Sequence, residues 1–95
     1  MRKEKLLKIE GEYVVMTFEQ VFDKYKNMLY KVCNRWKGTA EYNDLFQVAS
    51  IGLYKAFNSY DLTKGIEFST VAFTYIKNEI RSFYREAKNI LDIFH

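Results

Sequence analysis

The sequence has no proline, one cysteine and one histidine, and only four of its 95 residues are glycine. Proline breaks helices and glycine weakens them, so their scarcity favours a chain that is mostly helical. The lone cysteine, Cys33, excludes an internal disulfide and any metal site built from several cysteines. The only histidine, His95, is the last residue of the sequence, a position that argues against a role as a metal ligand or a base.

The sequence also lacks the usual marks of secretion, membrane insertion and catalysis. It has no apolar run long enough to span a bilayer and no signal peptide. It has neither a glycine-rich phosphate loop nor a motif of paired carboxylates. These absences predict a cytoplasmic protein that is not an enzyme, does not enter a membrane and needs no cofactor.

What the sequence does contain is apolar and aromatic. Hydrophobic residues make up 48% of it and aromatic residues 18%, with eight tyrosines and eight phenylalanines. This composition is too apolar for a disordered chain, and the length allows one domain at most. The net charge of +3 is mildly basic and does not by itself imply nucleic acid, so the placement of the charges has to decide.

Three segments place apolar residues at helical spacing, and they are expected to form helices at about 17–37, 43–58 and 70–90 or beyond. Thr17 and Gln20 form a capping box at the start of the first, and Gly38 is a stop signal after it. The second is expected to begin at Asn43 or Asp44, since both are good N-caps.

The second and third helices carry features that predict how they pack. Ala49 and Gly52 are small, which lets a neighbouring helix approach the second helix closely. Ser69 is the expected N-cap of the third helix, and Phe68 just before it is expected to plug the core. Cys33 lies in the apolar stripe of the first helix and is interpreted as a small buried apolar residue.

Residues 1–16 are expected to form a basic N-terminal arm that is interrupted at Gly11. Such an arm is usually a solvated terminus, and residues 13–16 within it suit either an extended or a helical conformation. Residues 17–95 are expected to form the domain itself. The predicted fold is therefore all-α, a compact bundle of three main helices with a short arm before it.

One face of the third predicted helix is basic. Spacings of three, one, three, four and three place the following residues on this face: Thr74, Lys77, Asn78, Arg81, Arg85 and Lys88. Lysine and arginine neutralise phosphates, while asparagine and threonine bond base edges or backbone. The alternative is an ordinary solvated face on which Glu79 and Glu86 pair with the cations.

Aromatic residues alternate with cations before and within the start of this helix. Tyr60, Phe73 and Tyr75 lie near Lys64 and Lys77 in the sequence. Rings that stack on bases beside cations that follow the backbone suit single-stranded nucleic acid. Filling of the core is the alternative, and for Tyr60 and Tyr75 the sequence leaves both interpretations open.

Two segments resemble region 2 of the sigma-70 family of bacterial RNA polymerase sigma factors. Residues 41–57 read EYNDLFQVASIGLYKAF, and residues 65–81 read GIEFSTVAFTYIKNEIR. The family pattern is Asp-Leu-x-Gln, Ile-Gly-Leu-x-x-Ala and Gly-x-x-Phe-Ser-Thr, followed by Ala and Ile at helical spacing, and it matches without gaps. The segment 76–80 is closer to alternative sigma factors of the sporulation and stress type than to housekeeping ones.

The resemblance implies that the second helix docks on the clamp helices of the largest subunit of core RNA polymerase. The positions carried over to this contact are Asp44, Gln47, Val48, Ser50 and Tyr54. Val48 stands where many members have an acidic residue, which implies either a weaker contact or one tuned to an apolar partner.

The resemblance also implies recognition and melting of the −10 promoter element through its non-template single strand. Tyr60, Asp61 and Lys64 match the pocket for a flipped base, and Val71 stands where a tyrosine usually stacks on the flipped adenine. Thr74 and Tyr75 stand where housekeeping members carry two tryptophans. The face that reads the upstream end of the element is matched by Lys77, Asn78 and Arg81, with Arg85 and Lys88 continuing it. Because Val71 and Thr74 remove aromatic stacking, the chain is expected to melt DNA less easily than a housekeeping sigma factor.

The sequence leaves the wider assembly open. The helix-turn-helix that reads the −35 element has no counterpart in these 95 residues, so we expect a split or minimal sigma subunit, bacterial or phage-encoded, or a segment of a longer protein. A partner subunit carrying region 4 and an anti-sigma factor are further partners to consider. The alternative functions are a polymerase-binding co-regulator or competitor that does not read promoters, and an unrelated all-α DNA-binding domain.

Overall fold

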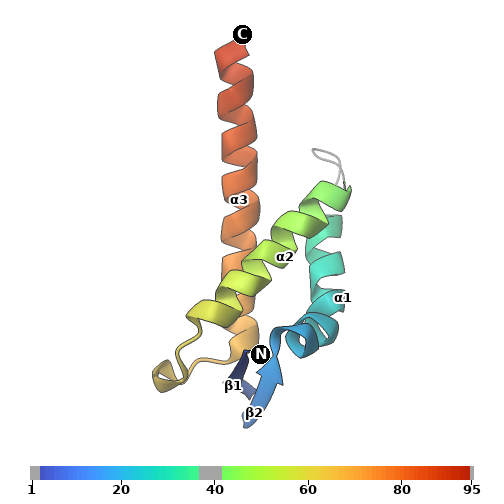
Figure 1. Ribbon diagram of the computed structural model, residues 1–95. Coiled ribbons are helices and arrows are strands. Elements are labelled where there is room, and N and C mark those ends of the chain that lie inside the picture. Colours follow the sequence, from blue (N-terminus) through green and yellow to red (C-terminus); the bar gives the residue numbers. More distant parts are fainter. Residues whose placement is uncertain (1–2, 37–41, 95) are drawn as a thin grey trace.

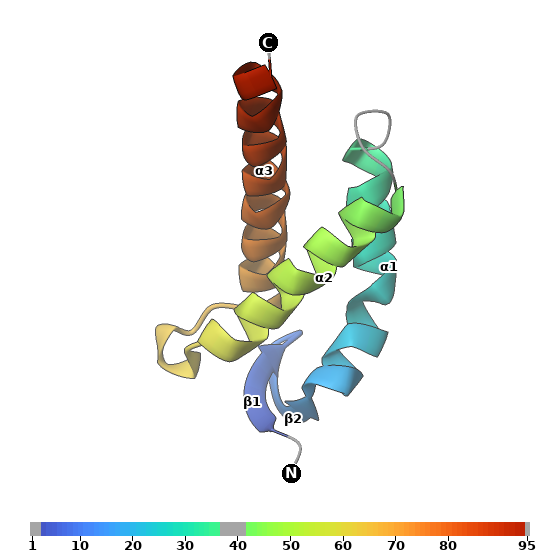
Figure 2. The same cartoon turned by 45° about the horizontal axis from the view of Figure 1, so that its top comes forward.

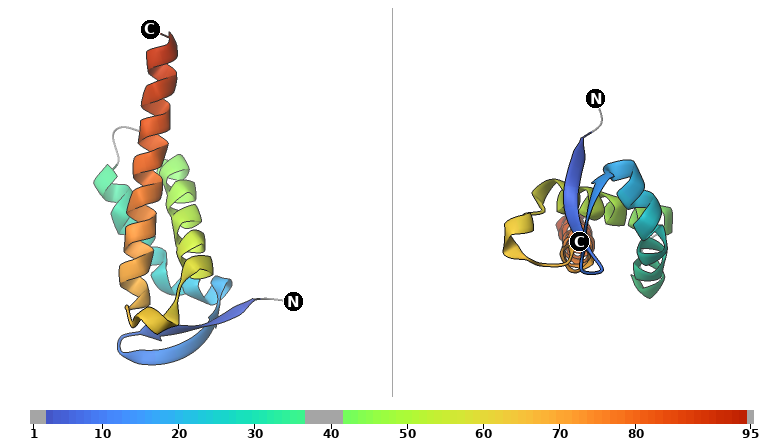
Figure 3. Two further views of the ribbon diagram at one scale, coloured as in Figure 1. Left: turned by 90° about the vertical axis from the view of Figure 1, so that its left-hand side faces the viewer. Right: turned by 90° about the horizontal axis from the view of Figure 1, so that it is seen from below.

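The computed structural model describes residues 3–36 and 42–94, including all side chains in these ranges except those of residues 42, 43 and 87–94. In chain order the elements are β1 (Glu4–Ile9), β2 (Glu12–Thr17), α1 (Phe18–Trp36), α2 (Tyr42–Ser59), a short 3-10 helix η1 (Leu62–Lys64) and α3 (Phe68–Phe94). The helix α3 is the longest and extends well past the ends of α1 and α2 (Figure 1). The two strands lie at the opposite end of the molecule, beneath the helices (Figure 3).

The N-terminal arm is a β-hairpin, which corrects the expectation of an all-α fold with a solvated arm. β1 and β2 pair in antiparallel fashion, with Leu7 opposite Val14. The turn between them consists of Glu10 and Gly11, whose φ angles are 51° and 80°. Two successive positive φ angles are typical of the tight turn that matches the twist of a hairpin. Leu7 and Ile9 are buried in the same core as the helices, so the arm packs against the domain.

The start of α1 agrees with its sequence signal. The backbone N–H of Thr17 donates to Gln20 Oε1 at 2.8 Å, and the N–H of Gln20 donates to Thr17 Oγ1 at 3.3 Å. This reciprocal pair is the predicted capping box, and the helix begins directly after it at Phe18. The predicted stop signal, Gly38, lies outside the described residues.

Both later helices begin earlier than their predicted caps. α2 begins at Tyr42, which places Asn43 and Asp44 inside its first turn. α3 begins at Phe68, and the carbonyl of Glu67 accepts the N–H groups of Thr70 and Val71. Ser69 is therefore a residue of the first turn, because the helix starts before it.

The helices α2 and α3 meet at small residues, and α2 crosses α3 obliquely (Figures 1 and 2). A methyl group added at Gly52 would lie 2.7 Å from the Cα of Ile76, so the two backbones are in close contact. Ala49 is fully buried, in agreement with the prediction that small residues mark this crossing. Phe68 is buried as the predicted plug, and Cys33 is buried with its thiol pKa raised by desolvation.

Candidate functional site

A pocket of about 140 Å³ lies where the loop after α2 meets the first turns of α3. The residues that line it are Ser59, Tyr60, Asp61, Lys64, Ile66, Val71 and Tyr75. Five of them were predicted from the sequence to contact DNA, although some come from the loop after α2, including η1, and others from α3. The fold thus brings together the loop residues and the α3 residues of the predicted base pocket.

Tyr60 forms the inner wall of this pocket and is only 6% exposed. Its hydroxyl donates to the carbonyl of Ile66 at 2.6 Å and accepts the backbone N–H of Lys8 at 3.2 Å. Its ring meets Phe68 edge-on, with the ring centroids 5.5 Å apart. The core-filling interpretation of Tyr60 is therefore correct, and its hydroxyl is already occupied within the fold.

Asp61 and Lys64 are exposed at the rim of the pocket. The carboxylate of Asp61 caps η1 by accepting the backbone N–H of Thr63 at 3.0 Å and its hydroxyl at 2.5 Å. These two hydrogen bonds, the one from the side chain above all, hold the pKa of Asp61 below its usual value. The cap is therefore fully formed above about pH 4 and is lost as the pH falls through the lowered pKa.

The predicted basic face runs along α3 away from the pocket. Thr74, Asn78, Arg81 and Arg85 are exposed on it, and the Thr74 hydroxyl donates to the carbonyl of Thr70 at 3.0 Å. Lys77 lies at its margin, half-buried, with its ammonium 4.8 Å from the centre of the Phe73 ring. Lys88 belongs to the same helix, but its side chain lies outside the described residues.

An acidic residue expected to neutralise this face points elsewhere. The carboxylate of Glu79 accepts a hydrogen bond from the Lys55 ammonium of α2 at 2.7 Å. None of the ion pairs found among the described side chains involves Arg81 or Arg85. The guanidinium groups of Arg81 and Arg85 are therefore available to a polyanion, since Glu79 pairs with Lys55 instead.

The outer face of α2 carries the residues predicted to dock on polymerase. Asp44, Gln47 and Tyr54 are exposed, whereas Val48 and Ser50 are half-buried. The Ser50 hydroxyl donates to the carbonyl of Phe46 at 2.7 Å, so it is engaged within the helix. Val48 packs against the core, which explains an apolar residue there without any contact to a partner.

The structure adds Ile51 to this face, a residue that the sequence analysis missed. Its side chain is 48% exposed, and it lies four residues after Gln47 and three before Tyr54. Such spacings place the three side chains on one side of a helix. The same spacing is visible in the sequence, and an apolar residue outside the core stripe was the signal that could have identified it.

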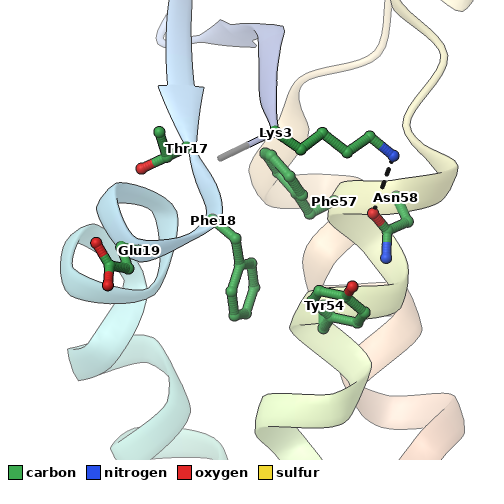
Figure 4. Close-up of a pocket in the computed structure, with 7 residues that line it drawn as sticks. All are labelled: Lys3, Thr17, Phe18, Glu19, Tyr54, Phe57 and Asn58. Atoms are coloured by element: carbon green, nitrogen blue, oxygen red, sulfur yellow. Dashed lines mark hydrogen bonds between the residues drawn. The ribbon is translucent and has the colours of Figure 1, made fainter. Parts of the chain in front are cut away.

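A second cavity adjoins this face at the end nearest the hairpin (Figure 4). It measures about 250 Å³, and its lining residues are Lys3, Thr17, Phe18, Glu19, Tyr54, Phe57 and Asn58. The Tyr54 ring packs edge-on against Phe18, with the ring centroids 5.0 Å apart. The exposed end of the α2 face therefore opens into a cavity with an aromatic floor and a polar rim.

The described residues also bear on metal binding and membrane insertion. Among the described residues there is no cluster of histidine, cysteine, aspartate or glutamate able to hold a metal ion. None of the described helices combines the length and the apolarity needed to cross a bilayer.

These features define a small helical domain with a basic helix face, a loop-lined pocket beside it and a separate polar and aromatic face on α2. The family model for Sigma-70 region 2 matches residues 21–90, which is most of the chain. The chain therefore belongs to the sigma-70 region 2 family, as its sequence predicted. Members of this family are transcription initiation factors, so the prediction that the chain is not an enzyme is confirmed.

Curated relatives support the same family. The RNA polymerase sigma-G factor of Bacillus subtilis is 36% identical over 69 residues, which cover 72% of this chain and 26% of that protein. The RNA polymerase sigma-B factor of Bacillus anthracis is 35% identical over 69 residues, covering 72% of this chain and 27% of the relative. The RNA polymerase sigma-F factor of Bacillus subtilis is 36% identical over 67 residues, covering 70% and 26%. The chain spans about a quarter of the length of these relatives. No solved structure matches the chain significantly.

Proposed function

We propose that this chain acts in transcription initiation by docking on core RNA polymerase through α2 and binding the −10 promoter element through the loop after α2 and the basic face of α3. The observation that carries the proposal is the pocket at the loop, which collects five predicted DNA-binding residues beside that face. A partner or a further region would supply recognition of the −35 element.

The proposed mechanism divides the contacts with DNA between the pocket and the helix face. A base taken out of the stack costs a few kcal/mol, which contacts inside the pocket have to offset. Val71 and Tyr75 supply apolar and aromatic walls, and Lys64 at the rim attracts the phosphate backbone. Tyr60 contributes a wall only, because its hydroxyl is bonded within the fold. Arg81 and Arg85 then follow the strand or duplex away from the pocket.

The proposed dock on polymerase uses the exposed side of α2. Gln47 supplies an amide at the centre of this face, and Ile51 and Tyr54 supply apolar contact area beside it. The cavity lined by Phe18, Tyr54 and Phe57 is suited to an apolar side chain of the clamp helices, because its floor is aromatic. A contact of this kind combines an apolar anchor with a polar rim, which is how tight interfaces are usually built.

The polymerase contact is tested by replacing Gln47 with alanine. We expect the dissociation constant with bacterial core RNA polymerase to rise by roughly 2- to 10-fold, the usual loss for one interfacial hydrogen bond. Co-elution in gel filtration, followed by titration, measures it. Asn27→Ala is the matched control, since Asn27 is an exposed amide on α1 away from the face. Equal binding by both variants would remove Gln47 from the dock.

The second candidate function is a polymerase-binding module that does not read promoters. Val71 and Thr74 favour it, because neither supplies an aromatic ring where the family uses one for stacking. Binding of a single-stranded −10-like oligonucleotide separates the two functions: a chain that binds polymerase but not this DNA would be such a module.

The DNA-binding proposal predicts the effect of removing two cations from the α3 face. The double variant Lys77→Ala with Arg81→Ala is expected to bind the oligonucleotide weakly, with the slope of log K against log salt concentration shallower by about 1.4. This value corresponds to two lost phosphate contacts with a single strand. Lys24→Ala with Lys31→Ala removes the same charge from the exposed side of α1 and should leave the slope unchanged. A slope that shifts equally in both variants would show that the effect is non-specific.

A further inference from the structure

The β-hairpin precedes the residues that the family model matches, yet it contacts the loop that lines the DNA pocket. The Lys5 ammonium donates to the carbonyls of Asn58 at 3.0 Å and Tyr60 at 3.1 Å. The Lys8 ammonium donates to the carbonyl of Gly65 at 3.3 Å. The strand β1 therefore follows the loop from the end of α2 to the residue after η1.

The hairpin also reaches the segment that leads into α3. The backbone N–H of Gly11, in the turn of the hairpin, donates to the carboxylate of Glu67, with distances of 3.2 and 3.4 Å to its two oxygens. The backbone N–H of Lys8 donates to the Tyr60 hydroxyl, which itself donates to the carbonyl of Ile66. One tyrosine thus connects β1, the start of the loop and the end of the loop.

Lys5 is partly buried and contacts the C-terminal end of α2. The last carbonyls of a helix have no partner within the helix, and a cation beside them is favoured by the helix dipole. The Lys5 ammonium donates hydrogen bonds to the carbonyl of Asn58 in the last turn of α2 and to that of Tyr60 just after it. It also lies 5.9 Å from the centre of the Phe57 ring. Burial is the main cause that lowers its pKa, so the charge is held partly out of water at a defined place.

We propose that the hairpin is a positioning element of the DNA pocket, with Lys5 of β1 holding the loop in the conformation that accepts a base. The inference rests on the proposed function of the pocket and assigns a role to residues before the family region. Two independent observations support it: hydrogen bonds from β1 go to the carbonyls of Asn58, Tyr60 and Gly65, at the end of α2 and in the loop after it. Tyr60, Asp61 and Lys64 of that loop line the pocket.

The physical reason is the cost of ordering the loop. A loop that is held in place before binding does not lose conformational freedom when the base enters. Without Lys5 that cost falls on the binding step, so affinity for the base drops while the contacts of the α3 face with phosphates persist. If Lys5 positions the loop, its removal should lower the affinity for DNA only when the base is present, and by a factor that does not change with salt concentration.

The experiment compares Lys5→Met with Lys3→Met in the full chain. Both changes remove one charge from the start of the hairpin and keep an unbranched side chain, but Lys3 donates to the side chain of Asn58 and not to the loop backbone. The probes are a single-stranded −10-like oligonucleotide and the same oligonucleotide with an abasic site at the flipped adenine. Dissociation constants are measured at several salt concentrations.

We expect Lys5→Met to bind the intact oligonucleotide roughly 3- to 10-fold more weakly and the abasic one as well as the wild type does, with an unchanged salt slope. Lys3→Met should match the wild type on both probes. Lys5→Arg, which keeps the charge and the donors, should restore discrimination between the probes.

Lys5→Met could instead lose equal affinity for both probes, with a slope of log K against log salt concentration that is shallower by about 0.7. That result would show that Lys5 contacts a phosphate and would overturn the positioning role. Identical behaviour of Lys5→Met and Lys3→Met would overturn it as well. If the wild-type chain binds neither probe, the proposed promoter function fails, and hydrogen exchange then decides separately whether Lys5 holds the loop.

Amide hydrogen exchange of the chain without DNA gives a second test that does not depend on promoter binding. Lys5→Met should accelerate exchange in residues 61–67 and leave α1 unchanged, whereas Lys3→Met should not accelerate it. Unaltered exchange in the loop of Lys5→Met would contradict the proposal. Accelerated exchange throughout the molecule would contradict it too, because it would assign Lys5 to global stability.

Discussion

Replacing Val71 with tyrosine is expected to strengthen binding of single-stranded −10-like DNA by roughly 5- to 150-fold. Stacking of a base on an aromatic ring contributes about 1–3 kcal/mol, which corresponds to this range. Val71 is half-buried and lines the loop pocket together with Asp61 and Lys64. A ring at this position would face the space that the flipped base is proposed to enter. Fluorescence anisotropy of a labelled oligonucleotide measures the affinity, and permanganate reactivity of a promoter in the presence of polymerase measures opening.

The control for this prediction is Val71→Leu, which adds apolar volume without a π-face. It should bind DNA within about 2-fold of the wild type, because it supplies no stacking. The gain of Val71→Tyr should also disappear on an oligonucleotide that is abasic at the flipped adenine. An absence of any gain on the intact oligonucleotide would count against Val71 as the position that faces the base, and with it against the alignment of the pocket with the family.

The helices could be predicted because their signals are local. The capping box of Thr17 and Gln20 depends on residues three apart, and both of its hydrogen bonds are present. The apolar stripes of α1 and α3 likewise follow from their 3.6-residue period. The starts of α2 and α3 were misplaced by one or two residues, because a good cap residue also fits the first turn of a helix. The helix α3 starts at Phe68 because the burial of this side chain in the core holds the backbone in place at that residue.

The hairpin was missed because its turn is an unusual one. Tight hairpin turns mostly use Asn-Gly or Asp-Gly, since the first residue adopts a positive φ. Here Glu10 takes that conformation, at a cost of roughly 1 kcal/mol for a residue with a side chain. Burial of Leu7 and Ile9 against the helices offsets this cost. The apolar runs on both sides of Gly11 were the available signal, but a single two-stranded sheet needs a packing partner that the sequence does not show.

The sequence could predict which residues lie together around the pocket, but not their burial or their hydrogen bonds. The resemblance grouped Tyr60, Asp61 and Lys64 with α3 residues, and the structure places them around one pocket. The burial of Tyr60 depends on the N–H of Lys8, and therefore on a hairpin that was not expected. The cavity beside Tyr54 likewise forms only where the end of the hairpin meets α1 and α2. The roles of these residues in binding, and a domain boundary at residue 17, stay predictions.

Gly52→Ala is expected to lower the free energy of unfolding by about 2 kcal/mol. The added methyl group would lie 2.7 Å from the Cα of Ile76 and 3.0 Å from the carbonyl oxygen of Tyr75, both in the backbone of α3. Overpacking usually costs about 1–3 kcal/mol, and a backbone neighbour cannot rotate away, so the upper end applies. The better helix propensity of alanine offsets about 1 kcal/mol. For a domain of this size the net loss corresponds to a melting temperature lower by roughly 8–16 °C, measured by circular dichroism.

Ile51→Ala is the control, because Ile51 precedes Gly52 but points to solvent and should cost less than about 1 kcal/mol. The two variants also separate stability from function. Ile51→Ala should weaken the polymerase contact in a stable domain. Gly52→Ala should move α3 away from α2 and widen the pocket at Tyr75, so it should weaken DNA binding even below its melting temperature. A Gly52→Ala chain as stable as the wild type would show that α2 and α3 are not in direct backbone contact, and the spacing that places Val71 and Tyr75 beside the loop would then need another cause.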